Sequence, residues 1–312
     1  MQRPFSEGAL ELKLGFLMAE LLQALASGLM VGSLYSLVGL GIVVIYKSTH
    51  VFNFAQGGLL MLGAYLAWCF MEQVGLPIWL GLISGLASAV MIGSLIERFG
   101  MRKLVGQPIL SLIIVTLALQ AFIDGIVTLF WGDNNYLVYP KFLPPNPVEF
   151  LNIILSLQHI IIFFITMLII GLFIIFFKYS KWGLDMRAVA EDHQAGMCMG
   201  ISTKMVFILA WVISTLLAYI GGVLLGSING VSTTLHQIAA NCFPVVLLGG
   251  LESIPGVLIA GLIVGILEYI SGLYLDPIVG ASTREIVPYI ILVLVLIIKP
   301  YGLFGLVRIE RI

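Results

Sequence analysis

Residues 181–201, with the sequence KWGLDMRAVAEDHQAGMCMGI, form a long polar segment between two strongly hydrophobic runs, 154–177 and 206–228. The polar segment cannot enter the hydrocarbon core of a bilayer. Each flanking run is long enough to cross it, because a spanning helix needs about 20 apolar residues. These three stretches predict two membrane-spanning helices joined by a loop on one face of the membrane.

The composition of the whole chain is that of a membrane protein. Hydrophobic residues make up 60% of the 312 residues and charged residues 10%, against about 25% charged in a soluble domain. The other apolar runs are 21–46, 51–71, 78–96, 109–131, 238–250, 255–275 and 286–298. Because backbone polar groups must be paired within lipid, each run is expected to be helical. We predict an all-α integral membrane protein, a polytopic bundle of eight or nine transmembrane helices with some of them broken.

The bundle is expected to be a single domain over residues 1–312. It comprises an N-terminal segment (1–20), a cytoplasmic loop (178–205) and a C-terminal tail (299–312). Residues 9–26 are predicted as an interfacial helix that leads into the first span. Glu7, Glu11, Lys13 and Glu20 are not typical of a cleavable signal peptide.

The basic residues predict the orientation, because Lys and Arg are retained in cytoplasmic loops. Eleven of them fall in one alternate set of loops and in the C-terminal tail. The other four, Arg3, Lys13, Lys141 and Arg284, belong to the opposite loops and the N-terminus. The C-terminus and the 178–205 loop are therefore placed in the cytoplasm and the N-terminus outside. This placement requires 238–250 to cross the membrane. A re-entrant hairpin there would instead place the C-terminus outside.

The pattern of reactive residues argues against an enzyme. Cys69, Cys198 and Cys242 are widely separated and the four histidines are dispersed, so we expect no disulfide framework and no metal site. We also expect no catalytic residues and no cofactor bound by this chain. Asp124 and Glu268 lie within predicted spans, where a carboxylate is a candidate functional group. We favour a structural role for both, because no Asp, Glu and His relay accompanies them.

Two interruptions of the apolar runs favour transport. The first, KSTHVFNFAQGG (47–58), contains Asn53, Gln56 and Gly57, and the second, LHQIAANCFP (235–244), contains Asn241. Breaks at matching places in two halves point to internal repeats with a pathway between them. We therefore predict that these four residues line the translocation path. The alternative is that the breaks are ordinary turns, with Asn53 as a helix cap.

Glycines spaced four apart predict close helix packing, either within the chain or against a second membrane subunit. The pairs are Gly81 and Gly85, Gly222 and Gly226, and Gly261 and Gly265.

Four segments resemble the permeases of ATP-binding-cassette (ABC) importers, and specifically the branched-chain amino acid subgroup. The loop sequence RAVAED (187–192) with Gly200-Ile201 is similar to the coupling loop of that subgroup. The other three matches are VFNFAQG with MLGAY (51–57 and 61–65), GGLESIPG (249–256) and KPYGLFG (299–305). The general coupling-loop pattern of ABC importer permeases is Glu-Ala-Ala, three residues, then Gly; here Gln194 replaces the Glu and Gly196 replaces the second Ala. In the other segments, Gln56 replaces the usual His and Glu252 replaces the usual Gly.

The resemblance implies a multi-pass permease of the prokaryotic inner membrane. Its partners would be a second, related permease, two cytoplasmic ATP-binding subunits, an extracytoplasmic solute-binding protein and a small solute, with no nucleic acid. ATP would be used by the partner subunits. Docking of those subunits is expected at Arg187, Glu191, Asp192, Gln194, Ala195, Gly196 and Gly200.

The resemblance makes leucine, isoleucine or valine the expected cargo, and urea or amides the alternative. A secondary transporter would need an intramembrane relay of ionisable residues, for which the sequence gives only a weak indication. An intramembrane enzyme would need a catalytic dyad or a metal cluster, and the sequence indicates neither. The negative charge of Glu252 has two explanations: the residue faces water at the cytoplasmic end of a helix, or it reflects a different cargo. We favour the first.

Overall fold

The computed structural model describes residues 7–104, 106–132, 137–140, 142–144, 146–150, 153–191, 193–280 and 282–305. The elements in chain order are α1 (Glu7–Thr49), α2 (Gln56–Trp68) continued by the π-helical turn η1 (Cys69–Gln73), α3 (Ile78–Leu95) continued by η2 (Ile96–Gly100) and η3 (Met101–Leu104), α4 (Ile109–Trp131), β1 (Pro147–Phe150), β2 (Ile153–Ser156), α5 (Leu157–Tyr179), α6 (Lys181–Glu191), α7 (His193–Cys198), α8 (Thr203–Asn229), α9 (Leu235–Ala240), α10 (Cys242–Gly249), α11 (Ile254–Tyr274), α12 (Asp276–Val279) and α13 (Val287–Ile298).

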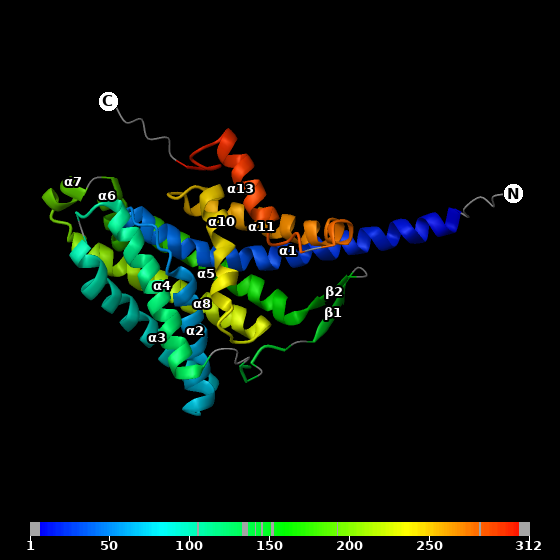
Figure 1. The fold of residues 1–312 in the computed structure, drawn as a ribbon, viewed down its shortest axis with the longest axis horizontal. Coiled ribbons are helices and arrows are strands. Elements are labelled where there is room, and N and C mark those ends of the chain that lie inside the picture. The colour runs from blue at the N-terminus through cyan, green and yellow to red at the C-terminus, as the bar shows by residue number, and fades with distance from the viewer. Residues whose placement is uncertain are drawn as a thin grey trace.

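The chain is a helical bundle with one short hairpin (Figure 1). Among the described residues, six helices are long and apolar enough to cross a membrane: α1, α3 with its continuation, α4, α5, α8 and α11. The apolar helical stretches Leu235–Gly249 and Val287–Ile298 are shorter. A multi-pass helical membrane protein is thus confirmed.

Two sequence-based boundaries are wrong, each for a local reason. Strands β1 and β2 pair antiparallel, with Pro147 opposite Ser156, so α5 begins at Leu157 rather than at 154. Helix α2 begins at Gln56 rather than at 51, because the Asn53 side chain accepts a hydrogen bond from Ala55 N (3.1 Å) in a turn. The expected interfacial helix at 9–26 is part of the continuous helix α1.

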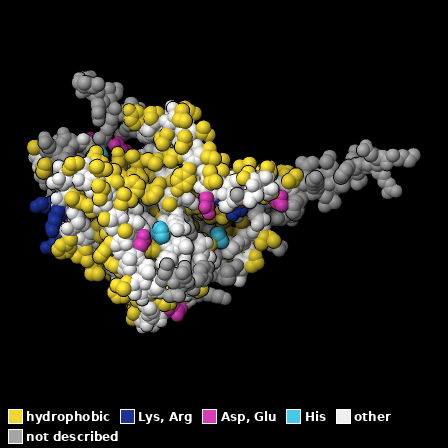
Figure 2. Space-filling model, in the orientation of Figure 1, with side chains coloured by type: hydrophobic (Ala, Val, Ile, Leu, Met, Phe, Trp, Pro, Cys, Tyr) yellow, Lys and Arg dark blue, Asp and Glu magenta, His cyan; other side chains and the backbone are white. Residues whose placement is uncertain are grey.

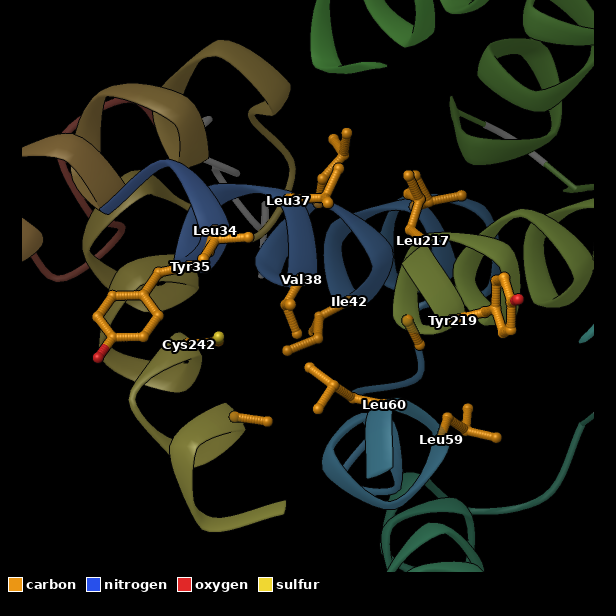
Figure 3. Packing of buried hydrophobic residues seen from close by; sticks show 14 of the residues in the cluster. Leu34, Tyr35, Leu37, Val38, Ile42, Leu59, Leu60, Leu217, Tyr219 and Cys242 are labelled. Carbon is orange, nitrogen blue, oxygen red and sulfur yellow. The ribbon is translucent and has the colours of Figure 1, made fainter. Parts of the chain in front are cut away.

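Helix α1 is the centre of the bundle. In its most apolar stretch 83% of the residues are buried, against 11% in α4. Its neighbours are α5, α8, α10 and α11. Figure 3 shows Val38 and Ile42 of α1 extending toward Leu60 of α2.

Glycines bring α1 and α11 into backbone contact. A Cβ atom on Gly28 would lie 2.7 Å from the carbonyl oxygen of Gly265, and one on Gly32 would overlap the carbonyl of Gly261. No side chain larger than hydrogen fits between these backbones. Gly261 and Gly265 therefore pack within the chain, as one of the two sequence-based alternatives predicted. Gly222 of α8 approaches the α2 backbone at Leu60 in the same way.

The two ends of the bundle differ in what they carry. At one end, Lys47 Nζ of α1 donates to Glu252 O (3.0 Å) and Leu303 N donates to Leu248 O (2.8 Å). Helix α6 contacts α1 and α5 at this end. At the other end, Gln23 Nε2 donates to Ile154 O (3.4 Å), which places the hairpin beside the N-terminal half of α1 (Figure 1). The chain between α8 and α11 therefore passes from one end of the bundle to the other.

The surface of the bundle is largely apolar. Figure 2 shows hydrophobic side chains over much of the visible face, with Lys and Arg gathered at the left edge, toward the end that carries α6 and α7. Large apolar side chains of α4 and α5 are exposed, among them Phe122, Leu129, Phe130, Phe164 and Leu168. Such a belt is what a helical protein presents to lipid.

The substitution Gly261→Leu should destabilise the protein, because the side chain cannot fit against the α1 backbone. Overpacking typically costs about 1–3 kcal/mol, so we expect a lower apparent melting temperature in nanodiscs. Gly125→Leu in α4 is the matched control, since nothing lies within 4 Å of its Cβ position. Equal melting temperatures for the two variants would contradict the assigned packing.

Candidate functional site

At the first helix break, the polar side chains of Asn53 and Gln56 are satisfied by hydrogen bonds to each other and to Ser214 of α8. Asn53 Nδ2 donates to Gln56 Oε1 (3.0 Å), and Ser214 Oγ of α8 donates to the same oxygen (2.8 Å). Gln56 Nε2 donates to Ser214 O (3.4 Å). Asn53 and Gln56 are 0% and 1% exposed. Their polar groups are thus used within the protein, and these side chains hold α2 against α8.

Gly57 also has a packing role. A Cβ atom there would lie 2.8 Å from the carbonyl oxygen of His236, so the start of α2 lies directly against α9. The next residue, Gly58, donates its N–H to Gln120 Oε1 (2.6 Å), and Gln120 Nε2 donates to Asp124 Oδ1 (2.9 Å). Asp124 therefore orients the glutamine that joins α4 to α2.

The second helix break faces a cavity. Asn241 lies between α9 and α10, where the backbone turns from one short helix into the next. A cavity of about 560 Å³ opens beside it, with polar walls formed by Thr234, Gln237, Asn241, Glu285 and Tyr289. Of the four residues predicted to line a path, Asn241 is the one that borders this cavity. Asn53 and Gln56 are not among the residues that line it.

A buried polar cluster lies behind Asn241. Its Nδ2 donates to Tyr35 Oη (3.5 Å), and Tyr35 Oη donates to Glu268 Oε1 (3.3 Å). Glu268 is 9% exposed, and its Oε2 has no hydrogen-bond partner among the described residues. A buried carboxyl oxygen without a partner is costly, and within a membrane span it makes Glu268 a candidate functional residue.

The polar segment between α5 and α8 folds as α6 and α7, two helices attached to the end of the bundle (Figure 1). Arg187 of α6 donates to Phe177 O and to Lys178 O (3.2 Å), and its guanidinium lies 5.5 Å from the Phe177 ring centroid. These are the last carbonyls of α5, which have no intrahelical partner. Arg187 thus anchors α6 to the bundle.

The other residues predicted for docking have different surroundings. Glu191 is exposed at the end of α6, and Gly196 is buried, with its Cβ position 3.2 Å from Val189 Cγ2. Gly200 has φ +80° and its N–H bonds to Met197 O (3.0 Å), so it ends α7 as a glycine C-cap. Asp192 lies outside the described residues, as do the side chains of Gln194 and Ala195.

An exposed apolar surface accompanies these two helices. Leu184, Met197 and Met199 are 58%, 54% and 82% exposed. These apolar side chains are exposed on a segment that is too polar to lie in the hydrocarbon core. We call Leu184, Met197 and Met199 the α6–α7 apolar surface. Sequence reasoning used the charged residues of this loop and missed its methionines, although Met197-Cys-Met199 is visible in the sequence.

Sequence reasoning also missed Tyr35, Glu285 and Tyr289. Tyr35 lies in a continuous apolar run, and Glu285 and Tyr289 flank the start of the last one. Nothing in the local sequence relates them to Asn241. Within the described ranges, no group of three or more His, Cys, Asp or Glu side chains could hold a metal ion.

The sequence of this chain is similar to that of known transport proteins. It matches the family described as branched-chain amino acid transport system, permease component, over residues 24–296. It is 30% identical over 305 residues to the high-affinity branched-chain amino acid transport system permease protein LivH of Escherichia coli, covering 93% of this chain and 97% of the relative. BraD, the permease protein of the corresponding Pseudomonas aeruginosa system, is 30% identical, with coverages of 93% and 98%.

A solved structure, PsaBC from Streptococcus pneumoniae in complex with Fab, resembles the fold with a TM-score of 0.49 and 14% sequence identity, covering 90% of this chain and 92% of that one. The sequence relationship is the stronger of the two, because it extends over most of the chain at much higher identity. By its match over residues 24–296, this chain belongs to the family of branched-chain amino acid transport system permease components.

Proposed function

We propose that this permease carries leucine, isoleucine or valine across a prokaryotic inner membrane as one subunit of an ATP-driven importer. The observation that carries the proposal is the family match over residues 24–296. The 30% identity to LivH and BraD, both named as high-affinity branched-chain amino acid permeases, supports the choice of cargo.

In the proposed complex, a second, related permease pairs with this chain, and two ATP-binding subunits dock in the cytoplasm. An extracytoplasmic binding protein delivers the solute. ATP hydrolysis takes place on the partner subunits. Each step of the cycle is a population shift, which requires that nucleotide and loaded binding protein bind one conformation better than another.

We propose nine membrane crossings. The six long helices supply six of them, and α2 with η1, α9 with α10, and α13 supply the other three. With the basic residues favouring the cytoplasm, the end that carries α6, α7 and residues 299–305 faces inward. The N-terminal end of α1 and the β-hairpin then face outward. The contacts of Lys47 with Glu252 O and of Leu303 with Leu248 O support this arrangement.

The docking site of the ATP-binding subunits is proposed to comprise the α6–α7 apolar surface together with Glu191 and Asp192. Arg187 and Gly196 act as positioning residues, because one ties α6 to α5 and the other packs α7 onto α6. Gly200 positions the turn into α8. Gln194 and Ala195 remain candidates for direct contact.

The solute path is proposed to run along the Asn241 cavity. Asn53, Gln56 and Gly57 support this path indirectly, because they fix α2 against α8 and α9. Their polar groups are already satisfied by protein partners.

The cargo can be identified with the reconstituted complex. This permease, its partner permease, the two ATPases and the binding protein should show ATPase activity and uptake stimulated by leucine, isoleucine or valine. Urea and short amides are the comparison solutes. Stimulation by urea alone would reassign the cargo. Solute uptake without any ATPase association would make the chain a secondary transporter.

Docking of the ATP-binding subunits can be tested by substitution on the α6–α7 apolar surface. Met199→Asp should weaken ATPase association about tenfold, because it places a charge in the centre of an apolar contact. The fold should be retained, since Met199 is 82% exposed. Val138→Asp, at a site that is 60% exposed in the segment between α4 and β1, is the matched control. Association is measured by co-purification at a series of ATPase concentrations. Wild-type association of the Met199→Asp variant would rule out this surface.

A further inference from the structure

The cavity beside Asn241 is bounded by two different parts of the chain. Helix α9 and Asn241 form one wall, and Glu285, Ile286 and Tyr289, at the start of α13, form the other. The two walls are linked where Tyr289 Oη donates to Ala240 O (3.4 Å). Of the described residues that line the cavity, one is charged, the carboxylate of Glu285.

The cluster behind the cavity orients the Asn241 amide. The Tyr35 hydroxyl donates its hydrogen to Glu268 Oε1 (3.3 Å). The Tyr35 oxygen then accepts from Asn241 Nδ2 (3.5 Å). With its nitrogen held toward Tyr35, the Asn241 amide presents its acceptor, Oδ1, on the other side. The wall of the cavity therefore offers a hydrogen-bond acceptor.

The charge on the wall of the cavity is negative. It is the carboxylate of Glu285. The nearest basic residue in sequence, Arg284, packs on α11 and is not among the residues that line this cavity: its guanidinium lies 5.1 Å from the Tyr269 ring centroid and 3.9 Å from Asp276 Oδ2. Arg284 lines a separate cavity between α1 and α11.

The loop before α13 brings Asp276 close to Arg284. Asp276 Oδ1 accepts hydrogen bonds from Thr283 N and Thr283 Oγ1, both at 2.6 Å. These bonds hold the pKa of the Asp276 carboxyl below its usual range, so Asp276 stays ionised near neutral pH and keeps its attraction for Arg284. Glu285 is left as the charge that faces the cavity.

We propose that this cavity is a solute subsite that receives a primary ammonium group, with Asn241 Oδ1 and the Glu285 carboxylate as its acceptors. An ammonium group has three donors and no acceptor, which matches a wall of acceptors with a negative charge. Ala240 and Ile286 offer apolar contacts beside it. The inference rests on the proposed function, which makes the solute an α-amino acid, and it adds that the membrane subunit itself selects for the amino group.

The test is equilibrium binding to the assembled complex in nanodiscs without the binding protein, with L-leucine and with 4-methylpentanoate, which lacks the ammonium group. The wild-type complex should bind leucine at least about tenfold more tightly, because a charge-assisted hydrogen bond is lost with the analogue. Glu285→Gln should reduce this preference about tenfold, mainly through weaker leucine binding. Glu285→Asp keeps the charge and should keep most of the preference.

Glu72→Gln is the matched control, because it removes an exposed carboxylate from η1, outside this cavity. An unchanged preference in Glu285→Gln, equal wild-type binding of both compounds, or no leucine binding up to millimolar concentration would each overturn the inference. The proposed function has a separate readout. If leucine-loaded binding protein still drives ATP-dependent uptake, the subsite alone is wrong, and if no solute does so, the function itself is wrong.

Discussion

The close approach of α1 and α11 is the contact on which the rest of the structure depends. Lipid offers no hydrophobic driving force between helices, so association relies on packing that small residues allow. Gly28 and Gly32 meet Gly265 and Gly261 backbone to backbone. This contact places α1 in the middle of the bundle, where its buried stretch serves as the surface on which α5, α8 and α10 assemble.

The position of α11 in turn sets both ends of the molecule. Its N-terminal end follows the turn at Glu252, whose backbone oxygen accepts from Lys47 beside α6. Further along, it supplies Glu268 to the cluster behind Asn241. One helix thus contributes to the end that carries the α6–α7 apolar surface and to the cavity wall. Glu252 itself is partly buried beside Lys47 and Arg187 rather than fully in water.

Sequence reasoning predicted the helical class and the six long apolar helices, because uncharged runs of about 20 apolar residues are typical of membrane-spanning helices. It predicted the family from four short segments. It predicted both breaks but could not distinguish a packing role from a role in the path. An expensive polar side chain in an apolar span is either paired or faces a cavity, and both cases give the same local pattern. The partner of Gln56 is Ser214, 158 residues away. The neighbours of Asn241 across the cavity are likewise distant in sequence, so only the fold distinguishes the sealed break from the open one.

The open break also provides a route by which events at one end can affect the other. Helix α10 begins next to Asn241 and ends at the turn that contacts Lys47. Its eight residues span about 12 Å, a length over which a helix moves as a rigid body. Asn241 in turn bonds to Tyr35 Oη (3.5 Å), which bonds to Glu268 of α11. One short helix thus connects the wall of the cavity with the end of the bundle at which α6 lies, and this connection comes from the break that separates α9 from α10.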